Sequence, residues 1–209
     1  ILLLCGACTV SSEYSLTIDE AGWCSQATQL PSPNCDGRPV DSVISLIVIH
    51  NISLPPNEFG GAWITDLFLN RLNPEAHPYF EAIHTHEVSS HFLIRRDGEL
   101  IQYVSTANRA WHAGISTWRG QSRCNDFSIG IELEGCDTKP FTHAQYDVLA
   151  ALTHTLKKYF PAINSVAGHS EIAPQRKTDP GPCFEWARYE YQANIDAELR
   201  ENKNQNLTH

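Results

Sequence analysis

The sequence lacks a surplus of basic residues, and it lacks any long apolar run. Lys and Arg total 15 against 24 Asp and Glu, which gives a formal net charge of −9. Proteins that bind nucleic acid carry a broad basic patch, so nucleic acid is not an expected partner. No apolar run reaches the roughly 18–20 residues that a membrane-spanning helix needs. An acidic ligand would have to be bound by a few local Arg or Lys side chains.

The cysteines are few, and their number is odd. Seven cysteines are present, and only Cys5 and Cys8 have the CxxC spacing typical of metal-binding or redox pairs. An odd count in a chain of this length indicates reduced, buried thiols of a cytoplasmic protein. A Cys24–Cys35 disulfide remains open, because the sequence does not show which cysteines are close in space.

Methionine is absent from the whole sequence, which begins with the apolar segment ILLLCGAC. Residues 1–16 are therefore treated apart. We favour the interpretation that this segment is translated upstream of the true start, so that the domain begins at Thr17. The alternatives are the remnant of an export or lipoprotein signal and a native packed segment. The domain is expected to span residues 17–200, followed by a polar tail at 201–209.

Hydrophobic patterns predict an α/β fold in a single domain, with a central sheet covered by helices. The β-branched run SVISLIVIH is typical of a strand buried on both faces. Asp97-Gly98 is a strong hairpin signal, and Thr142 with Gln145 three residues later predicts a capping box. The expected elements are a loop at 30–41, strands at 42–50 and 127–135, a hairpin at 91–104, and helices at 62–72, 142–159 and 183–200.

Three residues form a candidate metal site. His50 ends the first strand, at the sheet edge where ligands bind in α/β folds. His169 and Asp179 lie in VAGHSEIAPQRKTDPGP, which we interpret as a loop made rigid by proline and glycine. Two imidazoles and a carboxylate suit zinc and leave a fourth position for water. Taken singly, His50 is explained as well by a capping role, and Asp179 by a turn before Pro180.

Two further residues are candidates for catalysis. Glu132 and Glu134 point to one face of the strand FSIGIELEG, and one of them could take a proton from a metal-bound water. A solvated sheet face is the alternative. Lys177 could stabilise an oxyanion, or it could be a surface lysine beside Arg176.

The segment RAWHAGISTWRGQSRCND combines aromatic and basic side chains. Such a combination suits a cleft for sugars or peptide carboxylates, although a structural role is nearly as good an explanation for Trp118. A separate metal cluster among the histidines at 84–91 is disfavoured, because no complementary ligands accompany them. The residues of interest here are Trp111, His112, Trp118, Arg119 and Arg123.

Several motifs, taken in order, carry a family resemblance: VIHNISLPPNEFGG, SSHFLIRRDGELIQYV, RAWHAG, CNDFSIGIELEG and GHSEIAPQRKTDPGP. Together they resemble the AmpD-type N-acetylmuramoyl-L-alanine amidases, whose superfamily also includes phage amidases and peptidoglycan-recognition proteins. The similarity runs from about Gly22 to about Arg188. Long motifs in a fixed order make it specific. It implies a mixed central sheet flanked by helices.

The resemblance also implies an activity and a set of residue roles. The activity is zinc-dependent hydrolysis of the amide between the lactyl group of 1,6-anhydro-N-acetylmuramic acid and L-alanine in muropeptides. The implied roles are Zn²⁺ ligation by His50, His169 and Asp179, general acid/base catalysis by Glu132, oxyanion stabilisation by Lys177, and substrate contact by Asn51, Trp111 and Arg123.

The biological setting implied by the resemblance is cell-wall recycling. Such enzymes act in the cytoplasm on muropeptides released during wall turnover, and their loss in some bacteria raises β-lactamase expression. A monomer is favoured. The alternatives are a muropeptide-binding module without catalysis, a purely structural zinc site, and a periplasmic or lipid-anchored amidase that acts on intact peptidoglycan.

Overall fold

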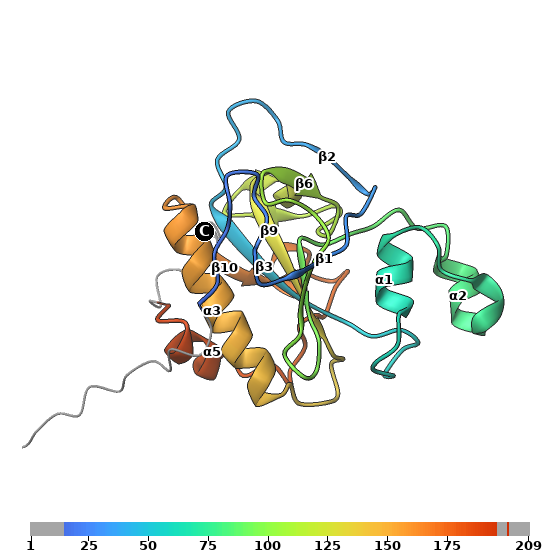
Figure 1. Cartoon of the computed structure of the whole chain (residues 1–209). Coiled ribbons are helices and arrows are strands. Elements are labelled where there is room, and N and C mark those ends of the chain that lie inside the picture. Colours follow the sequence, from blue (N-terminus) through green and yellow to red (C-terminus); the bar gives the residue numbers. More distant parts are fainter. Residues whose placement is uncertain (1–14, 196–199, 201–209) are drawn as a thin grey trace, which may run out of the picture.

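The computed structural model describes residues 15–195 and Arg200 (Figure 1). Most of the N-terminal segment 1–16, the tail 201–209, and Cys5 and Cys8 lie outside the described residues. The five other cysteines are all free thiols, so the Cys24–Cys35 disulfide that the sequence left open is absent. No helix in the described part of the chain has the length and apolar character to cross a bilayer.

A six-stranded mixed sheet forms the centre of the fold, as the sequence predicted. Its strands lie in the order β1-β5-β4-β9-β3-β10, and only β4 and β5 pair antiparallel. The antiparallel pair is the predicted hairpin, closed by Asp97-Gly98 with Gly98 at φ +92°. The strands span Thr28–Gln29 (β1), Leu46–Ile52 (β3), Phe92–Ile94 (β4), Leu100–Gln102 (β5), Ser128–Glu134 (β9) and Ser165–Gly168 (β10).

Side chains alternate between the two faces of β3 and β9, and this alternation places His50 and Glu132 on the same face. Ile47 and Ile49 pack into the core on one face, together with the odd-numbered apolar residues of β9. Leu46 and Val48 pack on the opposite face. Because β3 and β9 are parallel with His50 opposite Glu132, these two polar side chains share that opposite face.

Helices cover the two faces unequally. On one face lie α3 (His143–Tyr159) and α5 (Trp186–Gln192), which share the core cluster of Ile47 and Ile49. The other side carries α1 (Trp63–Phe68) and α2 (Pro78–Ile83), which pack around Leu93 and Tyr103 (Figure 1). The face of the sheet that carries His50 and Glu132 borders a cavity lined also by residues of α1, of α2 and of the loop with Lys177 and Asp179.

The predicted capping box at the start of α3 is present. Thr142 Oγ1 accepts a hydrogen bond from Gln145 N at 3.1 Å, and Gln145 Oε1 accepts one from Thr142 N at 3.0 Å. Thr142 Oγ1 also donates to the carbonyl of Arg96. The cap therefore ties the helix to the β4–β5 hairpin.

Several predicted boundaries were wrong. The first strand begins at Leu46 rather than residue 42, α1 is shorter than 62–72, and α5 is shorter than the helix predicted at 183–200. The loop predicted at 30–41 contains β2 (Cys35–Gly37), which pairs with β6 (Asn108–Ala110). The remaining short elements are η1 (Pro74–Ala76), β7 (Thr117–Trp118), β8 (Gln121–Ser122) and η2 (Cys124–Asp126).

The largest correction concerns the segment that carries His169. The sequence was interpreted as one rigid loop, but the structure forms β10 and then the short helix α4 (His169–Ile172). Glu171 Oε2 accepts a hydrogen bond from Gly168 N at 2.6 Å and so supports the turn from strand to helix. His169 thus stands directly after an edge strand that pairs with β3.

Candidate active site

Three side chains converge on one point at the end of β3. His50 Nδ1 lies 3.0 Å from His169 Nδ1 and 3.0 Å from Asp179 Oδ2, and His169 Nδ1 lies 3.1 Å from the same carboxylate oxygen. Among the described residues, no other group of three or more His, Cys, Asp or Glu side chains brings its ligand atoms together in this way. The sequence-predicted trio is therefore assembled from residues 119 and 129 positions apart.

The outward-facing nitrogens show which atoms are free to bind a cation. His169 Nε2 lies 3.1 Å from the carbonyl oxygen of Ala113, which can only accept, so a proton on Nε2 would leave the Nδ1 lone pair free to bind an ion. His50 Nε2 likewise has an outside partner, His112 Nδ1 at 2.9 Å. Together with the Asp179 carboxylate, the two Nδ1 atoms form a set of three potential ligand atoms whose chemistry fits a cation. Tetrahedral zinc would hold such atoms about 3.3 Å apart, close to the separations observed.

Electrostatics keep His50 and Asp179 in the ionisation states that a metal requires. Burial lowers the pKa of His50 to about 4, although its contact with Asp179 opposes the change. Burial alone would raise the pKa of Asp179, but the neighbouring His169 and His50 hold it below its usual value. At neutral pH His50 is neutral and Asp179 is ionised, as metal ligation needs.

Glu132 faces the same space from the neighbouring strand. Its side chain is almost fully buried, and its Oε2 atom has no hydrogen-bond partner in the described structure. Burial raises the pKa of Glu132 well above its usual value, the charge of Asp179 adds to this, and Lys177 acts in the opposite direction. A buried carboxyl with an unsatisfied oxygen and a raised pKa is typical of a group that exchanges protons with a ligand.

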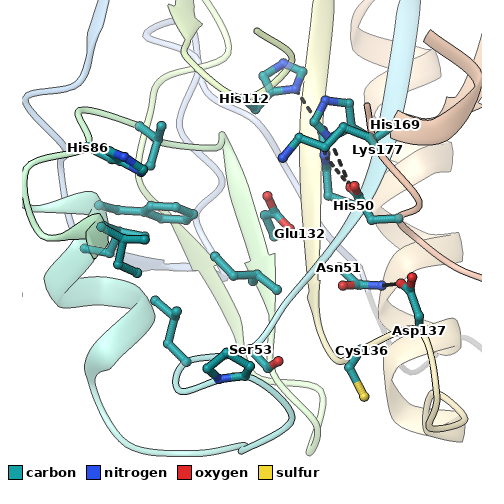
Figure 2. A pocket seen from close by; sticks show the side chains of 18 of the residues that line it. His50, Asn51, Ser53, His86, His112, Glu132, Cys136, Asp137, His169 and Lys177 are labelled. Carbon is teal, nitrogen blue, oxygen red and sulfur yellow. Dashed lines mark hydrogen bonds and ion pairs between the residues drawn. The ribbon is translucent and has the colours of Figure 1, made fainter. Parts of the chain in front are cut away.

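The trio and Glu132 line a cavity of about 520 Å³. Lys177 also lines it, and Figure 2 shows its side chain extending past the histidines, with Glu132 below. The opposite wall comes from α1, α2 and the loops around them, including Tyr79 and Ile83. The convergent trio, the buried Glu132 carboxyl and the Lys177 amine therefore border one space large enough for a small substrate.

Known amidases share sequence with the chain. The sequence profile of a family described as N-acetylmuramoyl-L-alanine amidase matches residues 39–182. The chain belongs to this family. The 1,6-anhydro-N-acetylmuramyl-L-alanine amidase AmpD of Citrobacter freundii is 58% identical over 175 residues, which cover 83% of this chain and 93% of that protein. The AmpD of Escherichia coli K12 is 57% identical over 171 residues, covering 81% of this chain and 93% of that protein.

Solved structures support the same membership. The crystal structure of a selenomethionine AmpD derivative matches with a TM-score of 0.82 at 57% identity, covering 84% of this chain and 98% of that one. A complex of the Escherichia coli N-acetylmuramyl-L-alanine amidase AmiD matches with a TM-score of 0.54 at 29% identity, covering 84% of this chain and 65% of that one. The chain is thus an amidase of the AmpD type, as its motifs indicated.

Two of the predicted substrate-contact residues line the amidase cavity. Asn51 follows His50 on β3, and its amide nitrogen donates to Asp137 Oδ1 at 2.8 Å and to the Pro180 carbonyl at 3.0 Å (Figure 2). It therefore ties the strand to the loop that carries Asp179. Trp111 lines the cavity as well, and its indole N–H donates to Asp36 Oδ1.

Other residues of the aromatic and basic segment lie elsewhere. Arg123 is outside the cavity lining and forms an ion pair with Asp126 at 3.0 Å, with 70% of its side chain exposed. Its role in substrate contact stays a prediction. Trp118 is buried in the core beneath β3 and has the structural role that the sequence left open. His84 bonds to backbone carbonyls of its own helix, so the histidines at 84–91 form no second metal cluster in the described region.

His112 is the residue of the amidase site whose position the sequence did not reveal. It belongs to the RAWHAG motif, but the motif was interpreted as part of a substrate cleft. In the structure its half-buried ring lies between β9 and His50 at the edge of the cavity, where it contacts both His50 and Ser128. The only sequence signal was the motif itself, because the contact joins segments 62 positions apart.

Proposed function

We propose that this amidase is zinc-dependent and cleaves the amide between the lactyl group of 1,6-anhydro-N-acetylmuramic acid and L-alanine in muropeptides. The observation that carries the proposal is the convergence of two imidazole nitrogens and a carboxylate oxygen beside a buried carboxyl with an unpaired oxygen. His50, His169 and Asp179 would hold the ion. Zinc, when bound, supplies Lewis acidity that polarises a carbonyl and makes water more acidic.

Glu132 and Lys177 supply the proton chemistry and charge stabilisation in this proposal. The Glu132 carboxylate accepts a proton from the attacking water as its oxygen adds to the lactyl carbonyl carbon. Glu132 then delivers that proton to the departing nitrogen of L-alanine, so that the C–N bond breaks and a carboxylic acid and an amine are released. The Lys177 ammonium stabilises the negative charge on the carbonyl oxygen.

The substrate class is supported by the relatives. The two AmpD relatives are named 1,6-anhydro-N-acetylmuramyl-L-alanine amidases, and the AmiD complex holds the substrate anhydro-N-acetylmuramic acid-L-Ala-D-gamma-Glu-L-Lys. A cavity of about 520 Å³ suits a ligand of a few sugar and amino-acid units. Asn51 and Trp111 line its wall, and Arg123 is proposed to contact substrate from outside that lining. We place the enzyme in cytoplasmic wall recycling, as a monomer that affects β-lactamase regulation.

The test compares soluble anhydro-muropeptide with intact sacculi as substrates. Purified protein is freed of metal with a chelator, reloaded with zinc, and assayed by mass spectrometry for free peptide and anhydro-sugar. Chelator-sensitive cleavage of the soluble substrate at the lactyl–alanine bond is the expected result. Glu132→Gln serves as the matched variant, because it keeps the shape of the side chain and removes its acid/base function.

Each alternative predicts a different result. Binding of muropeptide without release of peptide would favour a recognition module. Activity that survives complete metal removal would contradict the zinc proposal. Preferential cleavage of intact sacculi would favour an exported amidase and contradict the recycling role.

A further inference from the structure

We infer that His112 is a positioning residue for the metal centre: its Nδ1 atom accepts the outward hydrogen bond of His50 and so holds the His50 ring with Nδ1 toward the other two ligands. This inference rests on the proposed metal site. His112 itself is not among the ligand atoms that converge there. Its ring meets the His50 ring edge to face, with centroids 5.0 Å apart.

The His112 ring occupies the space beside Gly130 of β9, which has no side chain. On the functional face of β9 the sequence alternates Ser128, Gly130 and Glu132, opposite Leu46, Val48 and His50 of β3. A Cβ atom at Gly130 would lie 2.5 Å from Cγ of His112 and 2.7 Å from its Nδ1. The ring therefore fills the space that the missing side chain leaves, and packing fixes its orientation.

The two hydrogen bonds of the His112 ring fit one assignment of donors and acceptors. His50 Nε2 lies 2.9 Å from His112 Nδ1, and His112 Nε2 lies 3.1 Å from Ser128 Oγ. If His50 uses Nδ1 as a ligand, its Nε2 carries the proton and donates to His112 Nδ1. His112 must then carry its own proton on Nε2 and donate to Ser128 Oγ. A metal-ligating histidine usually donates its second N–H to such an outer partner, which fixes its tautomer.

The backbone of Ala113, the next residue, orients His169 as the His112 side chain orients His50. The Ala113 carbonyl accepts from His169 Nε2 at 3.1 Å. Asn125 Oδ1 in turn accepts from the backbone N–H groups of His112 and Ala113, at 3.2 and 2.8 Å. One short segment, anchored by Asn125, therefore orients both proposed histidine ligands, and within it only His112 acts through its side chain.

The experiment compares His112→Asn with His112→Leu. The two replacements have the same branched shape, but only asparagine keeps an acceptor near the position of Nδ1. Zinc affinity is measured by competition with a chromogenic chelator, and cobalt binding is followed by its visible absorption. We expect His112→Leu to bind zinc about 10–100-fold more weakly than the wild type. His112→Asn is expected to recover most of that affinity and to preserve the cobalt spectrum.

Two controls separate positioning from general damage. Leu156→Ala removes a fully buried side chain of α3 on the opposite face of the sheet, so it lowers stability and leaves zinc affinity unchanged. His154→Asn removes an exposed histidine of the same helix and controls for the loss of one imidazole. A fall in zinc affinity with Leu156→Ala as large as that with His112→Leu would overturn the inference.

The tautomer of His112 is read in the wild-type protein, so this measurement does not depend on a variant that folds. In the zinc-loaded protein, ¹⁵N shifts are expected to show His112 protonated at Nε2 and unprotonated at Nδ1. Protonation at Nδ1, or equal zinc affinity of His112→Leu and wild type, would overturn the inference. Wild-type protein that binds no zinc would instead refute the proposed metal site.

Discussion

Replacing Glu132 by Gln is expected to lower activity and raise stability together. The side chain is almost fully buried, its Oε2 atom has no partner in the described structure, and burial raises its pKa well above the usual value. The fold therefore disfavours the ionised carboxylate. Glutamine keeps the shape and removes the ionisation. Loss of general acid/base catalysis is expected to reduce turnover about 10²–10⁴-fold.

The stability gain follows from the direction of the pKa shift. The folded state keeps the Glu132 proton at pH values where the unfolded chain, with a pKa near 4.5, has lost it. The folded state then binds more protons, so the unfolding free energy of the wild type falls as pH rises from 4.5 toward the raised pKa. Because glutamine does not titrate, its advantage grows over that window, by at most about 1.4 kcal/mol per pH unit.

The assay is urea unfolding of metal-free protein between pH 4.5 and 8, combined with turnover of zinc-loaded protein. Glu134→Gln is the matched control, since Glu134 lies on the same face of β9 but accepts hydrogen bonds from Gly60 N and Arg96 N. That variant should lose stability. An unfolding free-energy difference between Glu132→Gln and wild type that stays constant with pH would refute the reasoning, as would normal turnover.

Three further outcomes are expected. Zinc at 100 times its dissociation constant should raise the unfolding free energy by about 2.7 kcal/mol over chelated protein; calorimetry with no change in Tm would contradict binding to the folded state. Gly130→Ala should cost about 1–3 kcal/mol, because its Cβ would lie 2.5 Å from the His112 ring; an unaltered urea midpoint would contradict that contact. Thr142→Ala should cost about 1 kcal/mol through loss of the capping box, and thermal unfolding that matches wild type would count against the cap.

Elements specified by local chemistry could be predicted from the sequence. The Asp97-Gly98 hairpin, the capping box at Thr142 and the long strand β9 depend on neighbouring residues, and the structure has all three. By contrast, β2 and β10 were missed. Each is defined by pairing with a strand distant in the chain, and neither has a strong pattern of its own. Short elements of this kind depend on tertiary contacts that propensity does not report.

The same distinction between local patterns and tertiary contacts applies to the site. The convergence of His50, His169 and Asp179 was expected from the family motifs and is present in the structure. The position of His112 was not expected, because it requires the register that aligns Val48 with Gly130 and leaves room for a ring. A motif marks a residue as important, but its contacts depend on how the strands pair.

The position of β10 at the edge of the sheet has a consequence for synthesis of the enzyme. His50 and Asp179 are separated by 129 positions, which a ribosome covers in roughly 6–26 s at about 5–20 residues per second. Until β10 pairs with β3, the emerging chain presents His50 alone in place of the converging trio. A fragment that ends before His169 therefore lacks two of the three converging side chains, and we expect it to be inactive toward cell-wall amides.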